Sequence, residues 1–269
     1  MIPSISSFSS DQTRQLKGVF FDIDDTFSLS GKIRASAYSA LWRLKESGYK
    51  LVPITGRPAG WCDHIARMWP VDGVVGENGA FYFRVDETKR KFIKRFIDDD
   101  CIRAEKRQKL EAIRDEVLET VKGTALASDQ FYREADLAID FCEDVPRLDW
   151  SSIDKICAIF KKHGATYKVS SIHVNGWFGE YSKLQMTRQL AQELWGIDLD
   201  LEKNRFVYFG DSPNDEPMFH YFPLSVGVKN VLEFTHKMTW LPAFVTNGEG
   251  GEGFAEAVDH ILYKKAHVQ

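Results

Sequence analysis

The chain has 269 residues, enough for a full α/β domain, a smaller second domain and a sizeable core. Hydrophobic residues make up 43% and charged residues 28% of the sequence, close to the average of globular proteins. The net charge of -4 gives no reason to expect nucleic acid or an anionic membrane as a partner. Apolar runs are only a few residues long, whereas spanning a bilayer takes roughly 20.

The N-terminal stretch MIPSISSFSSDQTRQ lacks the basic and apolar regions of a signal peptide, so we expect residues 1–16 to form a flexible, Ser-rich leader. The cysteines form no CxxC pair and match no metal-binding spacing. Their pattern favours reduced, mostly buried thiols, as is usual for cytoplasmic proteins. Together these features predict a cytoplasmic protein.

From Lys17 onward, strand-like and helix-like segments alternate, which predicts an α/β fold with a parallel sheet covered by helices. Ala37, Leu41 and Leu44 recur at helical spacing, and Gly48 then ends that helix. The first part of the chain is expected to contain a strand at 19–21, a helix at 35–47, a strand at 49–55, a helix at 59–68, and strand-like segments at 71–75 and 79–83.

Residues 86–179 differ in character and predict a compact α+β insert. We expect it to contain a charged helix at 105–122, a strand at 137–142, a helix at 151–162 and one strand at 166–174. The α/β pattern then resumes with a helix at 182–195 and a strand at 205–210.

Three aspartates follow the first strand in the stretch VFFDIDDTFS, residues 19–28. Along an extended chain Asp22 and Asp24 return to the same side, while Ile23 points away. Two such carboxylates suit Mg²⁺, which prefers oxygen ligands. They also suit a division of roles, in which one attacks phosphorus and the other transfers protons. An acidic turn that only ends a strand would have the same local pattern.

Two further segments carry groups that suit a phosphate. In PITGRP, residues 53–58, Thr55 ends a strand and Gly56 lets the backbone approach a ligand closely. Ser182 is a good N-cap, which places Lys183 in a first helical turn, where the helix dipole disfavours a cation unless an anion lies nearby. An ordinary Gly-Pro turn and a surface lysine are the alternatives.

The fourth segment is FGDSPNDEP, residues 209–217. Asp211 stands at the end of an apolar strand and could complete a magnesium site with Asp22. Asp215 could bind the metal directly or through water, or it could hold Lys183. An Asp-rich turn that caps a helix is the alternative. Because ligands bind at the carboxyl ends of parallel strands, we expect all four segments to converge.

The ordered set DxDxT, TGR, a lone Lys and GDSxND resembles the haloacid dehalogenase superfamily of phosphohydrolases, over essentially the whole chain from Lys17. The position of the insert and the segment GENGA, residues 76–80, resemble the Cof-like branch with its α/β cap. GDSPND is similar to the sugar-phosphate phosphatases of that branch, such as the mannosyl-3-phosphoglycerate, sucrose-phosphate and trehalose-phosphate enzymes. The resemblance implies a three-layer, Rossmann-like core with a parallel sheet at 17–85 and 180–269, and a cap at 86–179.

The resemblance also implies a role for each matching residue. The expected roles are Asp22 as nucleophile, Asp24 as general acid and base, Thr55, Gly56 and Lys183 as phosphate-binding groups, Asn214 as a group that orients phosphate or Lys183, and Asp22, the carbonyl of Asp24, Asp211 and a supporting Asp215 as the Mg²⁺ site. Asp25 stands where many members have Gly, and we leave it out of the catalytic set. We expect Arg57 to form a local salt bridge, and His173 could contact substrate from the last strand of the cap.

These features predict a Mg²⁺-dependent phosphomonoester hydrolase that forms an aspartyl-phosphate. Its expected partner is a small phosphorylated metabolite, with a sugar phosphate favoured. A phosphomutase of the same superfamily is the alternative. A non-catalytic phospho-receiver fits less well, because its acidic groups would lie on different strands instead of side by side.

Overall fold

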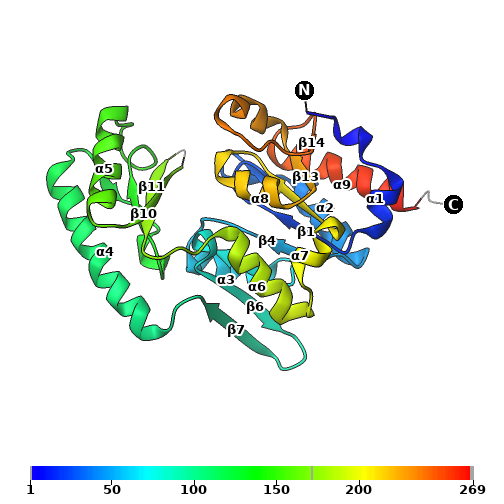
Figure 1. Ribbon diagram of the computed structural model, residues 1–269, viewed down its shortest axis with the longest axis horizontal. Coiled ribbons are helices and arrows are strands. Elements are labelled where there is room, and N and C mark those ends of the chain that lie inside the picture. The colour runs from blue at the N-terminus through cyan, green and yellow to red at the C-terminus, as the bar shows by residue number, and fades with distance from the viewer. Residues whose placement is uncertain (1, 171, 267–269) are drawn as a thin grey trace.

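The computed structural model describes residues 2–170 and 172–266, and its core is built on one parallel sheet (Figure 1). All neighbouring strands of this sheet run parallel. In spatial order the strands are β14 (Phe244–Val245), β13 (Leu224–Gly227), β12 (Phe206–Gly210), β1 (Gly18–Phe21) and β4 (Lys50–Pro53). Within the described residues, no helix has the length and apolar character that crossing a membrane requires.

Helices cover both faces of the sheet. Along β1 the side chains alternate: Val19 and Phe21 lie in the hydrophobic cluster on one face, and Phe20 lies in the cluster on the other. The first cluster is formed with α2 (Ala35–Glu46) and α9 (Gly250–Ala266), and the second with α6 (Lys183–Trp195) and α8 (Glu216–Tyr221). The predicted three-layer α/β core is therefore confirmed.

The N-terminal segment is packed, and the expectation of a flexible leader is wrong for its described residues. The segment forms two short helices, η1 (Ile5–Ser7) and α1 (Ser10–Gln15). Phe8 is fully buried, and its ring centroid lies 5.2 Å from that of Phe244. Ser4 pairs with Val245 beside the edge strand β14. A few apolar residues among the serines therefore suffice to bind this segment to the core.

A second, antiparallel sheet extends the core beyond β4. A bridge between Ile54 and Val75 connects the two sheets. The second sheet contains β5 (Val74–Gly76), β6 (Phe81–Asp86) and β7 (Lys91–Phe96), and α3 (Ala59–Met68) packs against it. The rings of Phe92 and Phe96 contact Phe83 across the β6–β7 hairpin. Because β7 belongs to this sheet, the insert begins later than the expected boundary at residue 86.

The insert is a separate four-stranded sheet with two helices on its outer side (Figure 1), and we call it the cap. It contains α4 (Asp100–Thr120), β8 (Ala125–Leu126), η3 (Gln130–Tyr132), β9 (Leu137–Asp140), α5 (Trp150–Lys162), β10 (Thr166–Val169) and β11 (His173–Trp177). The strand order is β10–β11–β9–β8, and all pairings are antiparallel. The single strand expected at 166–174 is wrong, because β10 and β11 form a hairpin.

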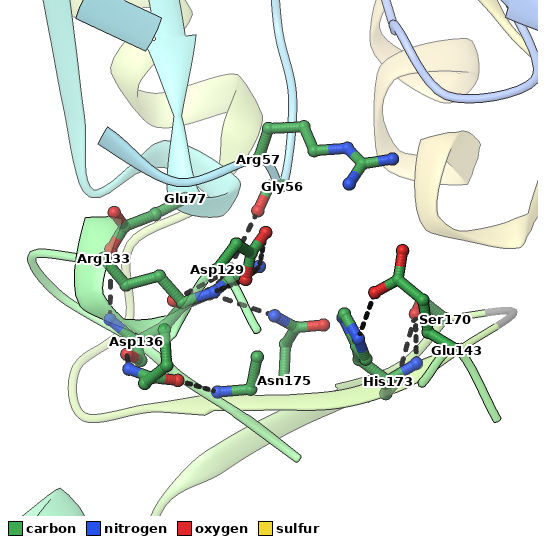
Figure 2. A network of polar contacts seen from close by, with 12 residues as sticks. Gly56, Arg57, Glu77, Asp129, Arg133, Asp136, Glu143, Ser170, His173 and Asn175 are labelled. Carbon is green, nitrogen blue, oxygen red and sulfur yellow. Dashed lines mark hydrogen bonds and ion pairs between the residues drawn. The ribbon is translucent and has the colours of Figure 1, made fainter. Parts of the chain in front are cut away.

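The buried carboxylate of Glu77 docks the cap onto the core (Figure 2). It accepts hydrogen bonds from the N–H groups of Glu134, Ala135 and Asp136 in the cap, at 2.9, 2.6 and 3.1 Å. It also accepts one from the N–H of Ala59, at the start of α3, at 2.9 Å. Burial raises the pKa of Glu77 to about 8. One core side chain thus holds three consecutive backbone groups of the cap.

Arg133 makes a second connection between the cap and the core. Its Nη1 atom donates to the carbonyl oxygen of Gly56 at 3.3 Å and to Asp136 at 3.0 Å. Gly56 belongs to the TGR segment, so the cap is joined directly to a predicted phosphate-binding loop (Figure 2).

We expect Glu77→Ala to lower the free energy of unfolding by at least about 3 kcal/mol, because four N–H groups would lose their acceptor. Urea denaturation measures this change. Glu87→Ala, at an exposed position, should change the value by less than about 0.5 kcal/mol. Equal effects of the two substitutions would contradict the docking role of Glu77.

Asp25 is a turn residue. It has a φ of 55°, and its Oδ1 atom accepts the N–H of Ser30 at 2.9 Å. Its carbonyl oxygen accepts a hydrogen bond from the side chain of Asn230 at 3.0 Å. A left-handed backbone favours Gly, Asn or Asp, which accounts for an aspartate at this position.

At this position we expect Asp25→Gly to change the free energy of unfolding by less than about 1 kcal/mol, since glycine adopts positive φ freely. Asp25→Val should cost about 2 kcal/mol or more, because a β-branched residue is strained there. Thermal or urea unfolding of both variants measures the difference. The turn role would be ruled out if valine were tolerated as well as glycine.

Candidate active site

The predicted residues gather at the carboxyl edge of the parallel sheet. Asp22 follows β1, Thr55 follows β4 and Asp211 follows β12. The N–H of Asp22 donates to the carbonyl oxygen of Phe209 at 2.9 Å, which fixes Asp22 beside the end of the neighbouring strand. Asp22 and Asp211 are both buried. The strand-end arrangement expected from the sequence is therefore present in the fold.

Lys183 enters this edge from the first turn of α6. The hydroxyl of Ser182 accepts the N–H of Gln185 at 3.2 Å and caps the helix. The Nζ atom of Lys183 donates to Asp22 Oδ1 at 2.6 Å and to Asp215 Oδ1 at 3.0 Å. Burial lowers the pKa of Lys183, but Asp215 and Asp22 together outweigh burial and hold it above the usual value.

Gly79 allows α6 to reach this position. Its φ is 107°, and a Cβ atom there would lie 2.2 Å from the carbonyl oxygen of Ser182. Only glycine permits so close an approach of the GENGA loop to the start of α6. The loop that docks the cap through Glu77 therefore also determines where Lys183 enters the site.

Asp215 is held on both of its oxygens by the protein. Its Oδ1 atom accepts from Lys183 and from the hydroxyl of Tyr208 at 2.6 Å, and its Oδ2 atom accepts the N–H of Asp211 at 3.1 Å. A Cβ atom on Gly210 would lie 2.6 Å from that Oδ2 atom, so the turn needs glycine to bring Asp215 back over the strand end. This arrangement fits Asp215 as a support for Lys183 and the loop.

Asp22, Asp211 and Asp215 form a group that fits a divalent cation. Each offers a carboxylate oxygen, and these atoms lie within 4.8 Å of one another. The hydroxyl of Thr26 donates to Asp211 Oδ1 at 2.8 Å, which orients that carboxylate. Burial raises the pKa of Asp22 to about 7, and burial with the charge of Asp215 raises that of Asp211 well above its usual value. Hard oxygen donors with excess negative charge are what Mg²⁺ binds.

Asp24, two residues beyond Asp22, is partly exposed and is held by Arg57. The Nε atom of Arg57 lies 3.0 Å from both carboxylate oxygens of Asp24, and Nη2 lies 2.7 Å from one of them. The guanidinium also lies over the ring of Trp61, 4.5 Å from its centroid. The salt bridge expected for Arg57 is confirmed, and its partner is the predicted acid and base.

The remaining predicted residues lie along the same edge. Thr55 is fully buried, and its hydroxyl oxygen accepts the N–H of Arg57 at 3.0 Å. Gly56 presents its carbonyl oxygen to Arg133 of the cap. Asn214 lies in the turn between Asp211 and Asp215, and its side chain accepts a hydrogen bond from Ser212 at 3.1 Å.

The cap presents polar side chains to this edge. His173 was expected there from the sequence, whereas Glu143 and Asp136 were not. His173 Nε2 lies 2.9 Å from Glu143 Oε2, and Asn175 donates to Asp136 at 3.3 Å. Figure 2 shows these cap residues across from Arg57 of the core. Burial lowers the pKa of His173, and Glu143 opposes that shift. Glu143 and Asp136 lie outside the strands of the cap, so no residue spacing could have identified them.

Solved structures resemble the chain over nearly its whole length. A Thermoplasma acidophilum protein has a TM-score of 0.71 at 17% identity, covering 92% of this chain and 98% of that one. The C-terminal domain of C. albicans trehalose-6-phosphate phosphatase has 0.70 at 12%, covering 100% and 99%. A Synechocystis sucrose-phosphatase, solved with sucrose and phosphate, has 0.62 at 17%, covering 92% and 98%. At these identities the likeness shows the fold.

Among curated proteins, none matches the sequence. The model of the family described as haloacid dehalogenase-like hydrolase matches residues 19–129 and 148–238, which include every predicted site residue. The chain therefore belongs to the haloacid dehalogenase-like hydrolase family, and its expected place in the Cof-like branch is confirmed.

Proposed function

We propose that the protein is a Mg²⁺-dependent phosphomonoester hydrolase that acts through an aspartyl-phosphate on a small phosphorylated metabolite. The observation that carries this proposal is the buried group of Asp22, Lys183, Asp211 and Asp215, next to the Asp24 that Arg57 holds. Membership in a hydrolase family supports hydrolysis as the reaction. The phosphatases among the structural neighbours agree with that reaction.

Asp22 is the proposed nucleophile. Its Oδ1 atom is held by Lys183, which orients the carboxylate, and its other oxygen has no hydrogen-bonding partner within the described residues. That oxygen forms the bond to phosphorus while the bond from phosphorus to the leaving oxygen breaks. A divalent cation on the acidic group would neutralise charge on the phosphoryl oxygens.

Asp24 is the proposed proton carrier. It gives a proton to the leaving oxygen, and in the second half of the reaction it takes a proton from the water that attacks the aspartyl-phosphate. That attack breaks the bond between phosphorus and Asp22 and releases inorganic phosphate. Arg57 fixes the Asp24 carboxylate where both transfers take place.

A sugar phosphate is the substrate class that we propose. The cap face across from Arg57 carries the polar side chains of His173, Asn175 and Glu143, which are groups that can bind the hydroxyls of a sugar leaving group. Two structural neighbours are named for phosphatases that act on disaccharide phosphates. These names support a sugar phosphate as the substrate class.

Phosphate release from sugar phosphates and nucleotides, with Mg²⁺ or with EDTA, tests the function. We expect Asp22→Asn to lower kcat by about 10³-fold or more, because the amide is a poor nucleophile. Asp25→Asn is a matched control in the same loop, because its turn position accepts asparagine, and it should keep activity. If the product were an isomerised sugar phosphate, with little phosphate released, the protein would be a mutase instead of a hydrolase.

A second prediction concerns pH and Mg²⁺. Burial raises the pKa of Asp22 above its unfolded value of 3.8 to about 7, so in the metal-free protein its contribution to stability is lost as pH rises through 7. Mg²⁺ and the proton compete for the Asp22 carboxylate, and the proton is lost as pH rises. The increase in Tm caused by Mg²⁺ should therefore grow between about pH 5 and pH 8. Asp211→Asn should reduce this increase. A Mg²⁺ effect that shrinks over the same range would contradict the proposed metal site.

A further inference from the structure

We propose that Lys168, on the cap, binds the phosphoryl group of the substrate as a second cation opposite Lys183. This inference rests on the proposed function, because it assigns a residue to the same phosphate site. It goes further in making the cap supply part of the phosphate-binding charge.

The hairpin of the cap determines the direction of Lys168. In the antiparallel pairing of β10 with β11, Lys168 lies directly opposite Asn175, so both side chains project from the same face of the sheet. The adjacent Tyr167 projects from the other face, where its ring lies 6.5 Å from that of Phe160 in α5. Lys168 therefore points away from the cap helices.

The face that carries Lys168 is the one that meets the core. Asn175 donates to Asp136, Asp136 accepts from Arg133, and Arg133 donates to the carbonyl oxygen of Gly56. Trp177, two residues along from Asn175, packs in a hydrophobic cluster with core side chains. Through these contacts the Lys168 face is placed over the TGR segment and the strand ends.

Lys168 has no oppositely charged partner within the described part of the chain. The side chain is partly buried and has no hydrogen bond or ion pair there. Burial lowers its pKa, and the positive charge of Lys183 lowers it further, while Asp215 and Asp22 act in the opposite direction. Its ammonium is therefore within electrostatic reach of the groups around the proposed nucleophile. An anion between the two lysines would relieve both the burial and the repulsion.

The charge balance of the core site shows why a second cation is needed. Asp22, Asp211 and Asp215 carry three negative charges, and Lys183 carries one positive charge. The excess of two negative charges is what a divalent cation would balance. A dianionic phosphoryl group brings two further negative charges, since a phosphomonoester is doubly ionised near neutral pH. Lys168 supplies positive charge from the side of the site that the core leaves to the cap.

Binding of inorganic phosphate tests the inference without any turnover. Phosphate has no leaving group, so its affinity reports contacts to the phosphoryl oxygens alone. With Mg²⁺ present, we expect calorimetry to show about 10- to 100-fold weaker phosphate binding by Lys168→Met, as for the loss of one charge-assisted hydrogen bond. Lys168→Arg should restore part of the affinity, because it keeps the charge.

Lys161→Met is the matched control, since it removes the same charge from an exposed position on the cap and should leave phosphate affinity unchanged. Without phosphate, Lys168→Met should unfold at the wild-type temperature or slightly above it, because an unpaired, partly buried charge is removed. This comparison separates a lost contact from a misfolded cap.

Unchanged phosphate affinity in Lys168→Met would overturn the inference, as would a wild-type protein that binds no phosphate. The inference would also be overturned if Lys168→Met lost no more phosphate affinity than Lys161→Met. A wild-type protein that binds phosphate through Lys168 but hydrolyses no phosphomonoester would refute the proposed function alone. The two failures are therefore distinguishable.

Discussion

The buried ion pairs of Lys183 are the constraint on which the site depends. Lys183 and Asp22 are separated by 161 residues in the chain, yet their charged atoms lie 2.6 Å apart in a buried place. Burying either charge alone would be costly, and removing one partner of such a pair typically costs about 3–5 kcal/mol. Asp215 completes the group and is itself held by Tyr208 and by backbone N–H groups. The α6 helix and the strand ends must therefore fold together.

The same constraint explains how three aspartates can stand within four positions. Each has a different partner: Asp22 meets Lys183, Asp24 meets Arg57, and Asp25 accepts a backbone N–H in its own turn. Lys183 and Arg57 each neutralise the charge of one aspartate, which reduces the repulsion among the three. Only Asp22 belongs to the buried acidic group, so the crowding in sequence is not crowding at the metal site.

Local patterns were sufficient to predict the core of the site and insufficient for the cap. Asp22, Thr55 and Asp211 follow strands, and Lys183 follows an N-cap, so each could be placed from neighbouring residues alone. Lys168 could not. A single strand at 166–174 would put it on the face opposite to His173, whereas the observed hairpin puts both on one face. Strand pairing is a long-range property that residue spacing does not reveal.

The packed N-terminal segment escaped prediction for the same reason, since its partners Phe244 and Val245 lie near the other end of the chain. The docking role of Glu77 was equally hidden, because its partners are backbone N–H groups, which carry no sequence signal. The bonds to the cap form because the fold places residues 134–136 beside the GENGA loop. Docking through backbone atoms has a further consequence. The bonds to Glu77 do not depend on which side chains residues 134–136 carry, whereas the contacts of Arg133 and Trp177 with the core do depend on their side chains.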